Sequence, residues 1–157
     1  MALVFRSVST FAAVVLAGAL VAGCGSKGPT AAPVACAGTA HDYLNALQAA
    51  PGTVRLEGET AISDCFTGEE DPNVAHAVIG AVSRLNAQAR RDPAGPATVR
   101  LGYLAGAVHS GTAHVPSDAD LVRRVDTAAR YVPGGGSMGA AFERAFGKGY
   151  AAGEATG

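Results

Sequence analysis

Apolar stripes with helical spacing, separated by Pro and Gly, most constrain how this chain can fold. From residue 39 onward, apolar side chains recur at intervals of three and four, the period of a helix with one buried face. Pro and Gly interrupt the pattern. Short connections between several helices are typical of an all-α bundle. The spacing predicts five helices, over about 39–50, 71–91, 97–108, 117–132 and from 137 through Tyr150.

Three of these helices have recognisable starts. Thr39 and Asp42 have the spacing of a capping box. Asp71 stands before Pro72, which favours Asp71 as the N-cap and Pro72 as the first helical residue. Ser117 is the predicted N-cap of the fourth helix. These starts support the helix boundaries that the periodicity indicates.

The N-terminal segment has the order of features of a secretory signal. Arg6 precedes an uncharged run, Phe11 to Ala22, whose twelve residues are fewer than the roughly 20 that a membrane-spanning helix needs. The run closes with Val21-Ala22-Gly23-Cys24. This sequence resembles the lipobox of bacterial lipoproteins, an aliphatic residue and two small residues before a cysteine. Residues 1–23 are therefore interpreted as a lipoprotein signal peptide.

The resemblance implies a covalent lipid and a location. The thiol of Cys24 would receive a diacylglycerol, cleavage would follow before it, and an N-acyl chain such as palmitate would complete the anchor. No other cofactor is expected. The mature protein would sit at the extracytoplasmic face of the cell membrane, with residues 24–35 as a Gly/Pro/Ser/Ala tether and 36–157 as a helical domain. An ordinary cleaved signal with an incidental cysteine is the alternative.

Cys36 and Cys65 remain once Cys24 is assigned to the lipid. A disulfide is their expected state in an oxidising compartment, worth about 3.6 kcal/mol for a loop of this length. Two free thiols in a metal or redox site are the alternative, although the spacing is unlike C-x-x-C. Residues 52–70 lack helical periodicity and are expected to lie over the helices, held by Cys65.

The sequence also contains an internal similarity. Residues 82–90 resemble 122–130 at an offset of 40, and 102–106 resemble 149–153 at an offset of 47. A duplicated helical hairpin would explain both, with the extra seven residues in the longer second turn. Chance similarity between Ala-rich helices is the alternative, and two units are too few for a solenoid.

Two Gly-x-x-x-Gly pairs fall within this similarity, Gly102/Gly106 and Gly149/Gly153. Such pairs occur where membrane helices dimerise, but both segments here have charged neighbours and lack a long apolar run. Close helix packing inside a soluble core is therefore the favoured interpretation. It predicts that Gly106→Leu prevents folding.

No established catalytic motif is present, so no enzymatic activity is predicted; a hydrolase is the least favoured alternative. The four histidines are expected to be exposed or in loops rather than metal-bound: His41, His76, His109 and His114. Acidic residues cluster between 57 and 71, but no calcium-binding loop pattern is present, and those at 69–71 are assigned to a helix start; a calcium site is the less favoured alternative. A net charge of −1 and the absence of Trp argue against nucleic-acid binding.

The arginines allow two interpretations. They can form a salt-bridged surface, with Asp120 four residues before Arg124 and Asp126 four before Arg130, or a strip that contacts anionic lipid headgroups or wall polymers. The strip would comprise Arg84, Arg90, Arg91, Arg123, Arg124 and Arg130.

Two functional hypotheses follow. The first is a non-catalytic binding or scaffolding role toward a protein of the cell envelope, which an exposed apolar patch would favour. The second is a small apolar or anionic ligand held between the two hairpins, near Tyr103 and Tyr150. A cavity above about 300 Å³ would favour the ligand.

Overall fold

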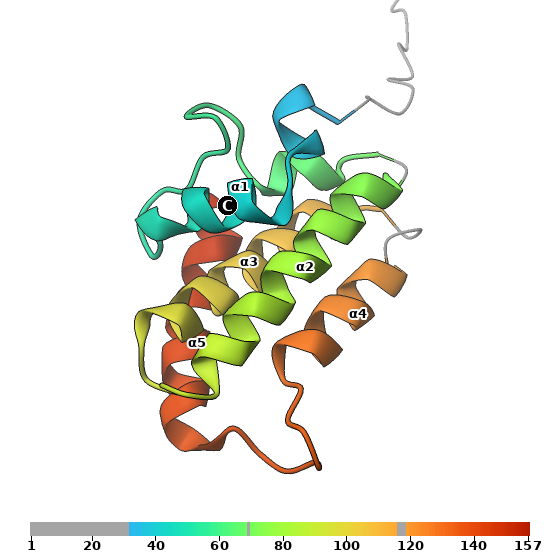
Figure 1. Cartoon of the computed structure of the whole chain (residues 1–157). Coiled ribbons are helices and arrows are strands. Elements are labelled where there is room, and N and C mark those ends of the chain that lie inside the picture. The colour runs from blue at the N-terminus through green and yellow to red at the C-terminus, as the bar shows by residue number, and fades with distance from the viewer. Residues whose placement is uncertain (1–31, 69, 116–118) are drawn as a thin grey trace, which may run out of the picture.

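The computed structural model describes residues 32–68, 70–115 and 119–157, which form the helical bundle of Figure 1. The predicted signal peptide, the predicted lipobox with Cys24 and the predicted Ser117 cap lie outside these residues. The described part contains helices and one isolated bridge between Leu56 and Thr60, so the all-α prediction is confirmed. Its elements are η1 (Val34–Ala37), α1 (Ala40–Ala46), η2 (Leu47–Ala49), η3 (Ser63–Phe66), α2 (Pro72–Ala89), α3 (Pro96–Thr112), α4 (Ala119–Ala129) and α5 (Gly139–Thr156).

Two predicted helix starts are confirmed. The Asp71 carboxylate accepts a hydrogen bond of 2.7 Å from the backbone N–H of Asn73, at the start of α2. The Asp42 carboxylate accepts from the backbone N–H of Thr39 at 2.7 Å and from its hydroxyl at 2.8 Å. These bonds lower the pKa of Asp42, because they stabilise the charged carboxylate.

Three helix ends differ from the prediction, and the first is that of α1, which ends at Ala46 and continues as the 3-10 helix η2. α3 continues one turn past Val108, and there Gly111 lets the helix approach the backbone of Ser63 in η3. α4 ends at Ala129 rather than at Val132. Val132 instead accepts a hydrogen bond of 3.0 Å from Gly135, whose φ of 83° turns the chain away from the helix.

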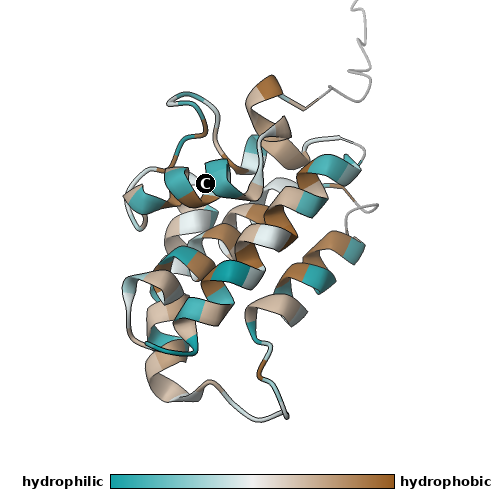
Figure 2. Cartoon of the chain, in the orientation of Figure 1, coloured by the Kyte–Doolittle hydropathy of each residue, from teal (hydrophilic) through white to brown (hydrophobic). Residues whose placement is uncertain are grey.

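α3 is the central helix. It contacts α2, α4, α5 and η3, so its side chains are buried on nearly every side and not only at the three positions of its predicted stripe. Figure 1 shows α2 in front of α3, with α4 beside α2. In Figure 2 apolar and polar residues alternate around α2 and α4, as expected for helices that each bury one face.

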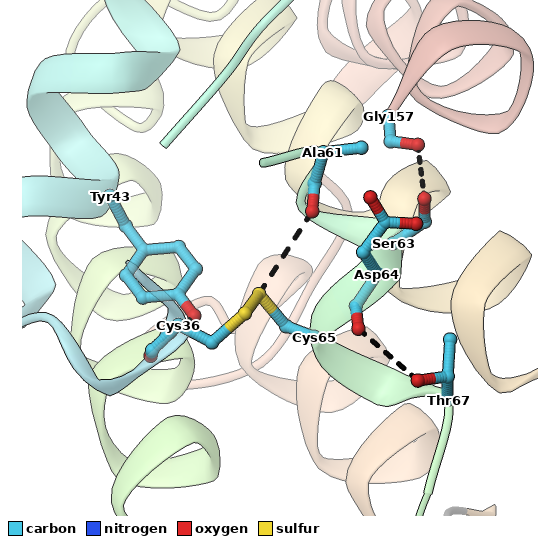
Figure 3. The surroundings of a disulfide bond; sticks show 8 residues. All are labelled: Cys36, Tyr43, Ala61, Ser63, Asp64, Cys65, Thr67 and Gly157. Atoms are coloured by element: carbon cyan, nitrogen blue, oxygen red, sulfur yellow. Dashed lines mark hydrogen bonds between the residues drawn. A yellow bond between two sulfur atoms is a disulfide. The ribbon is translucent and has the colours of Figure 1, made fainter. Parts of the chain in front are cut away.

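The N-terminal segments cover one end of the bundle. The predicted disulfide joins Cys36 to Cys65 with an S–S distance of 2.04 Å, and Figure 3 shows Tyr43 beside it. The hydroxyl of Tyr43 donates to the carbonyl of Cys36 at 3.0 Å, and burial raises the pKa of this phenol. Residues 52–66 lie over the helices as predicted, with Val54 and Ile62 fully buried.

Candidate functional site

The glycine pairs allow α3 and α5 to approach at backbone distance. A Cβ at Gly102 would overlap the carbonyl oxygen of Phe146, and one at Gly106 would overlap that of Tyr150. Because both contact positions advance by four residues in the same direction, α3 and α5 run parallel. The predicted packing role of these glycines is confirmed.

The contacts are reciprocal. Gly149 meets the carbonyl oxygen of Val99 and Gly153 meets that of Tyr103, which are the same contacts with the two helices exchanged at the offset of 47. This reciprocity supports the predicted duplication. The extra seven residues are not all in the second turn, however. Glu143 is the counterpart of Pro96, and α5 already begins one turn earlier, at Gly139.

Tyr103 is fully buried, and its hydroxyl forms hydrogen bonds inside the fold. Its hydroxyl accepts from the backbone N–H of Val54 at 3.2 Å and lies 2.9 Å from the hydroxyl oxygen of Thr156. The residue is fully buried, so it offers no surface to a ligand. The Thr156 hydroxyl in turn donates to the carbonyl of Ala152 at 3.0 Å, which completes the hydrogen-bonded chain.

Tyr150 is the counterpart of Tyr103 and has different surroundings. It is half-buried, stacks with Phe146 and meets His109 edge to face, with ring centroids 5.3 Å apart. Burial, the Glu154 carboxylate and Asp126 raise the pKa of Tyr150, whereas Arg130 lowers it. Both tyrosines therefore serve as packing contacts, and the region between them is not where the bundle is hollowed.

A groove of about 610 Å³ lies between α2 and α4. On α2 the lining residues are spaced by four, three and four, and on α4 they lie on the facing side and just beyond the helix end. The groove is therefore open along both helices and belongs to both predicted hairpins. Its lining residues are Ile79, Ser83, Asn86, Arg90, Arg123, Arg124, Thr127, Ala128 and Tyr131.

Asn86 bridges the two helices at the base of the groove. It is 2% exposed, and its amide donates to the carbonyl of Ala129 on α4 at 2.8 Å. Its amide oxygen accepts from the Arg90 guanidinium. The buried amide is thus satisfied on both sides, and it holds the guanidinium of Arg90, which also lines the groove.

The other two arginines have carboxylate partners. Arg124 lies 3.3 Å from Glu70, ahead of α2, and 3.7 Å from Asp120. Arg123 also pairs with Asp120. The predicted pair Asp120–Arg124 is confirmed. The positive charges of Arg123 and Arg124 are therefore largely compensated. Among the described residues, the hydrogen-bond partner of the Arg90 guanidinium is the neutral Asn86.

A second polar cluster pins α4 to α3. His109 Nε2 lies 3.1 Å from Asp126, and both side chains are half-buried. The expectation of an exposed or loop position is therefore wrong for His109, while His41, His76 and His114 are exposed. The predicted partner of Arg130 was Asp126, but Arg130 lies 3.8 Å from Glu143 and over the Phe146 ring.

Sequence reasoning missed the groove itself. Its signal was a polar residue within an apolar stripe, since Asn86 stands between Leu85 and Ala89 among buried positions. Its counterpart at offset 40 is Asp126, which also reaches to another helix. The six arginines were predicted as a strip, but residue spacing could not show that only Arg90, Arg123 and Arg124 among them line the groove.

Two absences concern metal ions and the membrane. Among the described residues, no three His, Cys, Asp or Glu side chains come together in a way that could hold a metal ion. None of the helices in the described ranges combines the length and apolar character needed to cross a bilayer.

The chain was compared with protein-family models, curated proteins and solved structures, and it matches none of them.

Proposed function

We propose that this protein is a lipid-anchored lipoprotein of the bacterial cell envelope that binds a small ligand in the α2/α4 groove. The groove carries the proposal, because its volume of about 610 Å³ falls within the roughly 300–1,000 Å³ typical of small-molecule sites. A ligand there would lie between the two hairpins, as the second sequence hypothesis expected, although away from Tyr103 and Tyr150.

A protein partner is less well supported. Among the described residues, the large exposed apolar side chains are Val34, 88% exposed, and Tyr131, 57% exposed. Val34 belongs to η1 and Tyr131 lines the groove, so the two do not form a joint apolar patch. The groove therefore favours a ligand over a scaffolding role.

The role is proposed to be non-catalytic because of the groove's chemistry. Its lining contains arginines, hydroxyls and an amide, but no His, Asp, Glu, Cys or Lys. Arginine stays protonated and cannot act as a general base at neutral pH. The His109–Asp126 pair does not line this groove.

The location rests on the lipobox resemblance. Cys24 would carry diacylglycerol and an N-acyl chain at the extracytoplasmic face of the membrane, and two or more acyl chains make such attachment durable. Metabolic labelling with radioactive palmitate of cells that express wild type or Cys24→Ser tests this. Wild type should take up the label and Cys24→Ser should not, and an unlabelled wild type would contradict the anchor.

The binding role has its own test. Native mass spectrometry of the protein purified from its cells should reveal a bound small molecule. Ser83→Trp, which fills the groove from α2, should abolish it, whereas Gln88→Trp, an exposed site on α2 outside the groove lining, should not. A bound molecule that survives Ser83→Trp would place the ligand elsewhere.

A further inference from the structure

We propose that the α2/α4 groove takes a single-chain amphiphile with an anionic head, the head at Arg90 and the chain running toward Ile79. The inference rests on the proposed ligand-binding function and adds the chemical class of the ligand. It concerns a free amphiphile, with a carboxylate or phosphate head, and not the headgroups of an intact bilayer.

The length of the groove suits one acyl chain. From Ile79 to Arg90 the α2 stripe extends about 16 Å, at about 1.5 Å per residue. An extended chain of about a dozen carbon–carbon bonds of ~1.5 Å spans a similar length. An elongated site of this length between two parallel stripes favours one chain over a bulky, branched ligand.

The lining suits an apolar chain despite its hydroxyl groups. Ser83 donates its hydroxyl hydrogen to the carbonyl of Ile79 at 2.8 Å, and Thr127 donates to that of Arg123 at 2.7 Å. A chain covering them would leave neither donor unpaired. Ile79 and Ala128 supply apolar contact, and the methylene stem of Arg123 adds to it.

The charge distribution places the head at Arg90. Arg123 and Arg124 already pair with Asp120, and Arg124 also with Glu70. Arg90 donates to the neutral amide of Asn86, which leaves other guanidinium N–H groups for an anion.

Tyr131 lies at the same end of the groove as Arg90 and is 57% exposed, so its hydroxyl can add a second donor. The C-terminal dipoles of α2 and α4 oppose an anion at this end. That effect is weaker than charge-assisted hydrogen bonds from a guanidinium. The balance of these effects therefore favours an anionic head beside Arg90.

The experiment is a calorimetric titration of the purified full chain carrying Cys24→Ser, which has no acyl anchor. The probes are dodecanoate, dodecyl phosphate and dodecanol, all below the concentrations at which they aggregate. We expect both anions to bind and dodecanol to bind at least about tenfold more weakly, since it lacks the charge-assisted contact.

Two variants locate the head. Arg90→Gln should weaken dodecanoate binding about tenfold and leave dodecanol binding unchanged. Arg91→Gln is the matched control, because Arg91 is the next residue, is exposed and does not line the groove. Equal effects of the two substitutions, or equal affinities for dodecanoate and dodecanol, would overturn the anionic head at Arg90.

The remaining outcomes distinguish a failure of the proposed ligand class from a failure of the proposed function. Ser83→Trp should abolish binding of dodecanoate while Gln88→Trp retains it, with circular dichroism showing that both variants fold. Failure of every amphiphile to bind would overturn the ligand class, yet a native ligand lost with Ser83→Trp would still uphold the proposed function. Binding only to phosphatidylglycerol vesicles would indicate a membrane-surface contact and contradict the inference.

Discussion

The two seams that join the hairpins, α3 against α5 and α2 against α4, differ in closeness. At the α3/α5 seam glycines bring the backbones into contact, and a Cβ at Gly102 or Gly149 would overlap a carbonyl oxygen. At the α2/α4 seam, side chains such as Ser83 and Thr127 keep the helices apart and leave the groove. Two similar hairpins can therefore hold the fold together through one pair of helices and leave a groove between the other pair.

The two tyrosines repeat this contrast at the level of single residues. Tyr103 reaches across to Thr156, and at the offset of 47 its counterpart Tyr150 reaches across to His109. The first pair is sealed under Val54, whereas the second is half-buried beside Asp126. Equivalent positions have thus become a closed internal contact in one copy and a partly open, charged one in the other.

The largest expected effect comes from placing a large side chain at a glycine of the α3/α5 seam. Gly106→Leu and its counterpart Gly153→Leu should each lower the free energy of unfolding by at least about 4 kcal/mol, because backbone atoms of the facing helix cannot move aside. Since small domains have only about 5–15 kcal/mol in total, neither variant should fold well. Thermal melting followed by circular dichroism measures this.

Gly147 provides the matched control on the same helix. A Cβ there meets nothing within 4 Å, so Gly147→Ala should raise the free energy of unfolding by about 1 kcal/mol through helix propensity alone. If Gly153→Leu melted like wild type, close approach at the α3/α5 seam would be wrong.

The contrast between the seams also explains what the sequence could predict. Apolar periodicity and the Pro and Gly interruptions were sufficient to predict the helices, and the spacing of Gly102 and Gly106 was sufficient to predict close packing. Both predictions depend on residues that are near one another in the sequence. The groove depends on how far apart α2 and α4 sit, which follows from the packing of both on α3. Likewise, nothing near His109 in the sequence indicates Asp126, which lies on another helix.

The next effect concerns the disulfide-linked segment over one end of the α3/α5 seam, residues 36–65, called the strap below. Replacing Cys36 and Cys65 together by Ala should lower the free energy of unfolding by about 3.6 kcal/mol, since the unfolded chain regains the entropy of a 29-residue separation. Chemical denaturation of the variant and of wild type measures it. Arg55, in the strap, donates to the carbonyl of Thr156 at 3.0 Å, so amides at the end of α5 should also exchange faster.

The α2/α4 seam supplies the contrast for that variant. No part of the disulfide-linked strap lines the groove, so the binding affinity of the folded variant should match that of wild type. A large loss of affinity at a temperature where the variant is folded would show that the strap shapes both seams.

The tyrosine pair gives a smaller, sharper test. Tyr103→Phe should lower the free energy of unfolding by about 1–3 kcal/mol, because the buried N–H of Val54 and the hydroxyl of Thr156 both lose a partner. Tyr150→Phe should change it by about 0.5 kcal/mol or less, because this residue is only half-buried. Equal effects in urea denaturation would contradict the asymmetry between the two copies.

The smallest expected effects concern the two polar contacts that hold α4 from both sides. Asp126→Asn replaces the carboxylate beside His109, and Glu70→Gln removes one of the two carboxylate partners of Arg124; each should cost about 1 kcal/mol or less because all four groups are partly solvated. Added salt should reduce the cost of Glu70→Gln, because that pair joins two full charges. Hydrogen exchange gives the more telling measurement, since opening of α4 alone should speed exchange in 119–129 while 96–112 stays protected. If both segments instead exchanged together in both variants, α4 would be as firmly part of the bundle as α5, and the two seams would differ in shape but not in stability.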